Sequence, residues 1–119
     1  TGKDLTGKDL TGTIFTGANL SDTNLTGKDL TGKDLTGTIF TGANLSNAKM
    51  LDVNLTGANL QNADLRYTLL VDANLLNAIL TGADLSQAVL SGAILTGANL
   101  EDSILTNAIL NCIGHPICI

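Results

Sequence analysis

A large apolar residue recurs at every fifth position of this 119-residue chain. When the sequence is cut into fives from residue 1, the fifth slot is apolar in twenty-two consecutive units, nineteen times as Leu. An α-helix would rotate successive fifth residues by about 500°, so no buried stripe would form. A flat strand would send them to alternate faces, because its side chains alternate with period two. We therefore expect the chain to turn a corner once per unit, so that every fifth residue points inward.

The other four slots of the unit fit such a corner. Slot 2 is Gly in twelve units and often Asn or Asp elsewhere, and these residue types accept positive φ. Slot 1 is mostly Thr or Ser, whose hydroxyls bond nearby backbone groups at bends. Slot 3 is most often Ala and is expected to point inward with the Leu, whereas slot 4 is expected to point outward. The pattern predicts a coil of short sides around a narrow core of Leu and Ala.

The units Ala-Asn-Leu-Thr-Gly and Ala-Asp-Leu-Ser resemble those of the pentapeptide-repeat proteins, and this resemblance covers residues 1–110. It implies an all-β fold, a right-handed quadrilateral β-helix with four units to each turn and therefore about 5.5 turns here. Residues 111–119 keep none of the slot order. Because a solenoid needs a cover over its last turn, we expect them to form a C-terminal capping tail.

Residues 1–20 and 26–45 are identical, which suggests a recent duplication or deliberate construction. The chain also begins within the pattern at Thr1 without a Met, as expected of a processed or partial product. The duplicated segment places lysine in the inward slot 3, at Lys3, Lys8, Lys28 and Lys33. An isolated buried ammonium is costly, so we favour open or distorted first turns whose lysine stems reach outward to water. Pairing with internal carboxylates and a functional basic site are the alternatives.

The net charge of −5 lies entirely in the second half of the chain. Residues 1–49 hold five Lys and five Asp, whereas residues 50–119 hold Arg66 against six acidic residues. A surface of this sign repels a polyanion, so we do not expect a nucleic acid partner. The sequence shows no apolar run long enough to span a bilayer and no signal peptide, so we expect no membrane span.

Aliphatic residues gather in the outward slot 4 of the second half. Leu69, Val89 and Ile109 are four units apart, so on a four-sided coil they form one vertical line. Ile94 and Ile104 are expected on the two flanking faces. The simplest interpretation is β-propensity on an exposed strand. The register of the five residues also predicts a protein-contact stripe.

The tail contains Cys112, His115 and Cys118 in the spacing C-x2-H-x2-C. Structural zinc takes four ligands and this motif offers three, so we do not expect a metal. The alternatives are packed thiols or a Cys112–Cys118 disulfide, which would indicate an oxidising compartment. We place the protein in the cytoplasm by default, and in the periplasm or thylakoid lumen if the two cysteines are oxidised.

The sequence contains no arrangement typical of catalysis or of cofactor binding. Its single His lies in the tail, and its Ser and Thr residues occupy corners without a base in sequence context. We therefore expect a non-enzymatic module without cofactors, a rigid rod that displays surfaces for protein binding or self-association. The alternative comes from the family resemblance: some pentapeptide-repeat proteins imitate DNA and bind type II topoisomerases, and the acidic second half is compatible with that role.

Overall fold

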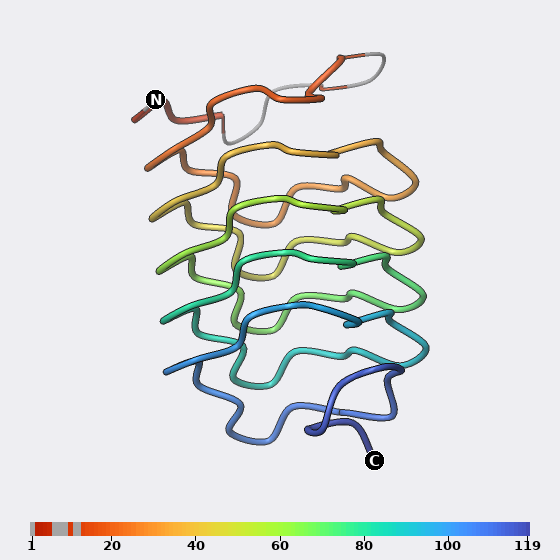
Figure 1. Ribbon diagram of the computed structural model, residues 1–119. Helices are drawn as coiled ribbons and strands as arrows, with labels where there is room; N and C mark the ends of the chain where they lie inside the picture. Colours follow the sequence, from red (N-terminus) through yellow and green to blue (C-terminus); the bar gives the residue numbers. More distant parts are fainter. Residues whose placement is uncertain (1, 6–9, 11–12) are drawn as a thin grey trace.

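The chain forms a stack of flat coils along one axis, with its two ends at opposite ends of the stack (Figure 1). The structure is a computed structural model and describes residues 2–5, 10 and 13–119. Within those ranges the backbone makes single parallel β-bridges separated by two-residue turns, and neither an α-helix nor a longer strand is present. The molecule measures 36 × 21 × 19 Å, so it is a short rod.

Each bridge joins residues twenty positions apart, as between Asn24 and Asn44, so four units complete one coil. The bridges connect slot-4 residues into four columns, and each column lies on one face of the rod. The columns are face 1, Asp4, Asn24, Asn44, Asp64, Asp84 and Ile104; face 2, Asp29, Lys49, Leu69, Val89 and Ile109; face 3, Asp34, Asn54, Asn74, Ile94 and Ile113; and face 4, Asn19, Ile39, Asn59, Ile79 and Asn99.

The corner of each unit is made by a left-handed residue in slot 2. Glycine holds this position at Gly57 (φ 66°), and Asn47 takes the same conformation (φ 60°). The turn is closed by a slot-3 N–H donating to the preceding slot-5 carbonyl, as from Ala58 to Leu55 (3.0 Å). Between coils, the N–H groups of slots 2 and 5 donate to the next coil, and slot 4 donates back. In the middle coils the N–H groups of slots 2 to 5 and the carbonyls of slots 1, 3, 4 and 5 are therefore paired within the backbone, as a buried backbone requires.

Slots 5 and 3 fill the interior, as the sequence pattern predicted. From Leu25 to Leu95 every slot-5 side chain is 0–1% exposed, including Phe40 and Met50. The slot-3 alanines from Ala43 to Ala93 are equally buried. Inward threonines satisfy their hydroxyls locally, since Thr38 Oγ1 donates to the Phe15 carbonyl (2.7 Å) and Thr68 Oγ1 to that of Leu65 (2.8 Å). The core is therefore a continuous column of leucines lined by small residues.

The lysines of the duplicated segment do not all reach outward, so the favoured interpretation is wrong for Lys28. Lys3 is exposed, but Lys28 is 8% exposed and takes part in a further interaction. Lys33 is half-buried; its Nζ donates to the Leu10 carbonyl (2.9 Å) and lies 6.0 Å from the centre of the Phe15 ring. The carbonyl and the aromatic face replace part of the hydration that the Lys33 ammonium loses on burial. Lys8 lies outside the described residues.

The tail continues the ladder further than its sequence indicated. Ile113 forms a bridge with Ile94, nineteen residues earlier instead of twenty, and Gly92 N–H donates to the Asn111 carbonyl (3.0 Å). The tail therefore extends the column of face 3, although this last coil is one residue shorter than the others. It then turns back under the last coil, where Ile119 N–H donates to the Leu110 carbonyl (2.8 Å).

Candidate interaction surface

The predicted stripe residues lie on three neighbouring faces of the C-terminal coils. Bridges join Leu69 to Val89 and Val89 to Ile109, so these three stand in consecutive coils on face 2. Ile104 is on face 1 and Ile94 on face 3. Leu69 and Val89 are half-buried, whereas Ile94, Ile104 and Ile109 are 37%, 47% and 51% exposed. The exposed apolar area therefore increases toward the C-terminal end.

The same columns are polar in the N-terminal coils. Face 2 begins with Asp29 and Lys49, and face 1 presents Asn24 and Asn44 above Ile104. Backbone geometry is the same along each column, so this change is a property of the side chains alone. On faces 1, 2 and 3 the slot-4 residues thus change from polar in the N-terminal coils to aliphatic in the C-terminal coils, whereas face 4 carries Ile39 and Ile79, and Ile14 near the N-terminal end is 86% exposed.

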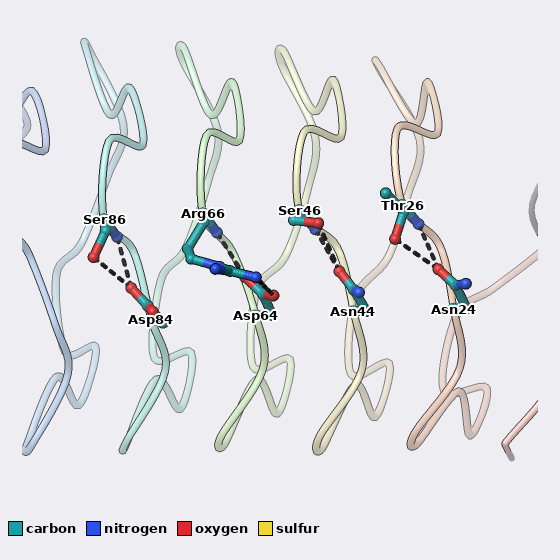
Figure 2. A network of polar contacts seen from close by, with 8 residues as sticks. All are labelled: Asn24, Thr26, Asn44, Ser46, Asp64, Arg66, Asp84 and Ser86. Atoms are coloured by element: carbon teal, nitrogen blue, oxygen red, sulfur yellow. Dashed lines mark hydrogen bonds and ion pairs between the residues drawn. The ribbon is translucent and has the colours of Figure 1, made fainter.

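Polar side chains in slot 4 cap the next corner. Asn24 Oδ1 accepts from Thr26 N–H (3.1 Å) and Thr26 Oγ1 (2.6 Å), and Asn44 accepts in the same way from Ser46. Figure 2 shows four such pairs stacked along face 1. The slot-1 hydroxyls were expected to bond the backbone; instead, those that follow an Asn or Asp in slot 4 donate to that side chain, as Ser21, Thr36 and Ser86 do. An Asn or Asp followed two positions later by Thr or Ser is the signal for this contact.

One of these corners carries an ion pair. Arg66 N–H donates to Asp64 Oδ1 (3.1 Å), and its Nε and Nη2 donate to Oδ1 (2.9 Å) and Oδ2 (2.7 Å). The Arg66 hydrogen bond is the main reason that the pKa of the Asp64 carboxyl lies below its ordinary value. For Asp29 and Asp34, it is the hydrogen bonds from Thr31 and Thr36 that lower the pKa. These carboxylates stay ionised at neutral pH as corner caps.

Tyr67 is an exposed residue that the sequence analysis did not single out. It occupies slot 2 with φ 61° and is 56% exposed. A bulky residue in the left-handed region is an outlier, since glycine or asparagine fits there without strain. The signal was present in the sequence, because the only Arg and the only Tyr stand side by side where most units have Thr-Gly or a similar pair. Arg and Tyr are common among residues that dominate protein interfaces.

The tail residues form a compact cover over one part of the last coil. Cys112 and Cys118 are joined by a disulfide with Cα atoms 5.0 Å apart, and both side chains pack against the core. His115 Nδ1 accepts a bond from Ile117 N–H (3.3 Å). In the ranges that the structure describes, no three His, Cys, Asp or Glu residues converge as a metal site would require, and no helix is long and apolar enough to cross a bilayer.

A coil of five-residue units, with an inward leucine, an inward small residue and a left-handed corner, defines a β-solenoid repeat protein. The family model described as pentapeptide repeats matches in eight copies, over residues 1–32, 18–57, 58–97 and 83–112. The chain therefore belongs to the pentapeptide-repeat family.

Solved structures with similar sequences come from cyanobacteria and plants. A pentapeptide repeat protein (Rfr23) from the cyanobacterium Cyanothece is 40% identical over 84% of this chain and 63% of its own, with a TM-score of 0.42. One from the thylakoid lumen of Arabidopsis thaliana is 27% identical over 82% of this chain and 66% of its own, with a TM-score of 0.47. The chain thus spans about two thirds of the length of these relatives.

A third solved structure shares the fold at lower identity. QnrB1, described as a plasmid-mediated fluoroquinolone resistance protein, is 18% identical over 93% of this chain and 70% of its own, with a TM-score of 0.51. At that identity the likeness is one of fold. No curated protein matches the chain.

Proposed function

We propose that this chain is a rigid, non-enzymatic protein-interaction module, a right-handed quadrilateral rod of about 5.5 turns whose outer faces bind a protein partner or a further copy. Its contact surface is the stripe of Leu69, Val89 and Ile109 with Ile94 and Ile104 beside it. Residues 1–110 form the repeat, and residues 111–119 form the capping tail. A narrow interior filled by Leu and Ala side chains supports display on the outside over binding inside.

The observation that carries this proposal is the contrast between the two ends of face 2. The column changes from Asp29 and Lys49 to Leu69, Val89 and Ile109 while its backbone register stays at twenty residues. The fold does not require aliphatic residues at these positions of face 2, because the coils with polar residues there form the same bridges. Exposed aliphatic residues that cross three faces form a patch that a partner can desolvate.

Charge substitution on the stripe tests the proposal. We expect Val89→Lys and Ile109→Lys to abolish the co-purification of a specific partner, or to lower the mass measured by light scattering if the chain self-associates. Ile79→Lys is the matched control, because Ile79 is 39% exposed in the same slot but lies on face 4. If association and partner binding survive both stripe substitutions, the stripe is not the contact surface.

A second candidate function, imitation of DNA on a type II topoisomerase, is favoured by the acidic second half of the chain. Residues 50–119 carry all of the net charge of −5. However, Arg66 neutralises Asp64 on face 1, and the remaining carboxylates are spread over several columns. QnrB1 has this fold and is described as a fluoroquinolone resistance protein. A gyrase supercoiling assay decides between the two, since an interaction rod leaves supercoiling unchanged at high protein concentration.

The compartment follows from the state of the tail cysteines. A lasting Cys112–Cys118 disulfide supports an oxidising location such as the periplasm or the thylakoid lumen over the cytoplasm. Trapping free thiols in freshly lysed cells, with mass spectrometry of the tail peptide, distinguishes these locations.

A further inference from the structure

The last coil ends in an edge whose backbone groups are not paired. In the coil before it, the N–H groups of Leu80, Gly82 and Leu85 donate to the carbonyls of the next coil. The equivalent donors Leu100, Asp102 and Leu105, and the equivalent acceptor at the Ser103 carbonyl, have no such partner in the described part of the chain. An uncovered edge of this kind is a template for an added strand.

The tail covers only part of this edge. Ile113 pairs on face 3, Ile119 bonds Leu110 at the end of face 2, and Gly114 lies against Thr96. The segment 100–105, which ends face 4 and forms face 1, receives no backbone bond from the tail. As a result, Leu100 and Leu105 are half-buried, whereas their counterparts Leu80 and Leu85 are 1% exposed.

A buried hydroxyl marks the same position. Ser103 points inward from slot 3, and its Oγ is buried without a hydrogen-bond partner, the one such side-chain atom in the ranges that the structure describes. Inward threonines elsewhere find a carbonyl, as Thr68 does. Buried polar groups are almost always paired, so an orphaned one calls for a partner.

We propose that segment 100–105 is a docking edge for an extended strand of another protein, with apolar side chains and basic residues at its flanks. To extend the ladder by one unit, the bound strand must supply two carbonyls three residues apart, one to accept from Asp102 N–H and one from Leu105 N–H. It must also supply one N–H that donates to the Ser103 carbonyl. Its apolar side chains cover Leu100 and Leu105. Glu101 and Asp102 are exposed carboxylates beside the edge and attract the basic flanks.

The charges also disfavour pairing with the same edge of a second copy of this chain. Pairing two such edges would bring both copies of Glu101 and Asp102 into one interface, and residues 50–119 offer a single Arg to compensate. A basic strand meets no such repulsion. The edge shares Ile104 with the proposed contact surface but lies apart from the Val89 column on face 2, so substitutions at Val89 test the proposed function without testing the edge.

A blocked peptide, acetyl-Lys-Val-Thr-Val-Lys-amide, is the probe for this edge. Titrated into the isotope-labelled protein, it is expected to shift the amide signals of Leu100, Asp102 and Leu105 in a saturable way. The same peptide with Glu flanks, or with N-methylated central amides, is expected to leave them unchanged. The absence of saturable shifts at millimolar peptide, or shifts that are as large with the N-methylated peptide, would overturn the proposal.

Matched variants separate the edge from the rest of the surface. Asp102→Asn is expected to weaken peptide binding about twofold to fivefold, the size of one exposed charge pair. Asp52→Asn is the control, because Asp52 has the same slot and a similar φ (56° against 58°) but its N–H donates to Val71. Val89→Lys is expected to leave peptide binding unchanged. Concentration-dependent broadening of the edge amides without peptide would instead show a second copy there, and the proposed occupant would be wrong.

Discussion

A slot-2 residue is coupled to the slot-2 residue one coil later. Where Asn or Asp takes a corner and glycine holds the next corner of the column, the side-chain oxygen lies over that glycine, and a Cβ placed there would collide with it. Asn47 and Asp52 are followed instead by Tyr67 and Asp72, so the contact is not a feature of every such corner. Glycine follows in four such cases: Asp22 and Gly42, Asn62 and Gly82, Asp72 and Gly92, and Asn77 and Gly97. Glycine at these positions therefore serves two purposes, since it accepts positive φ and leaves room for the side chain above.

Gly92→Ala tests this coupling against Gly57→Ala. Both glycines have positive φ, 71° and 66°, so alanine costs about 1 kcal/mol at either. At Gly92 it also displaces the Asp72 carboxylate, whereas no atom lies near a Cβ at Gly57. We expect Gly92→Ala to lower the free energy of unfolding, measured in urea, by about 1 kcal/mol more than Gly57→Ala. Asp72→Gly should remove that difference; equal costs in the two single variants would contradict the coupling.

The Asp64–Arg66 pair makes a pH-dependent contribution to stability. The pKa of Asp64 is lower in the folded state, so this contribution is complete above the unfolded value of about 3.9 and is lost as the pH falls through the folded pKa. Asp64→Asn keeps the corner acceptor, as Asn44 does, but loses the charge. We expect it to cost about 0.5 kcal/mol at pH 7, because Arg66 is half-exposed. The cost should decrease as the pH is lowered below the unfolded pKa in urea titrations, and an undiminished cost at acidic pH would exclude the ion pair as its cause.

At the scale of the element, each unit from residue 16 to residue 110 is a complete side of the coil, and the tail departs from that pattern. The Cys112–Cys118 disulfide closes a short loop that contains Ile113 and directly follows Asn111, and both of these residues pair with the preceding coil. These two carbonyls accept from Gly92 N–H (3.0 Å) and Leu95 N–H (2.8 Å). The cross-link should therefore stabilise the last coil without affecting the middle of the rod.

Replacing both cysteines by serine tests this locality. We expect Cys112→Ser with Cys118→Ser to weaken the closed tail by about 2 kcal/mol, the entropy of so short a loop. Hydrogen exchange of the Gly92 and Leu95 amides should then accelerate, whereas the Gly57 and Leu60 amides should keep their protection, since they bond only their own neighbouring coils. A reductant should accelerate exchange at Gly92 and Leu95 in the parent protein and have no effect on the variant. Faster exchange throughout the rod would mean that the coils unfold as one unit.

The conformation of the single repeat unit could be predicted from the sequence, whereas contacts between coils could not. The inward Leu and Ala, the left-handed corner and the column of Leu69, Val89 and Ile109 all follow from slot number and a coil of four units. The position of Lys28 depends on groups outside its own unit, and the pairing of Ile113 depends on one deleted residue. The proposed docking edge could not be predicted for the same reason, because no residue type indicates where backbone hydrogen bonds between coils are missing.

At the scale of the whole molecule, a unit is not tied to one face. The duplicated segment is offset by five units, so Asn19 lies on face 4 and its duplicate Asn44 on face 1. Leu20 beside the first packs against the core, and Leu45 beside the second is fully buried. The core therefore accepts the same unit on different sides, as expected for a solenoid whose stability is a sum over neighbouring units.

Deleting whole units tests that interchangeability. Removing residues 46–65 takes out one coil and leaves every later residue on its face, whereas removing 51–65 takes out three units and moves Leu69, Val89 and Ile109 one face round. Because each junction still stacks Leu on Leu, we expect both deletions to fold, with urea unfolding free energies within about 1 kcal/mol of one another. Removing 51–64 is the control, since it shifts every later slot by one and points the leucines away from the core. If the three-unit deletion unfolds like that control, the faces are specified individually and the additive description of this rod is wrong.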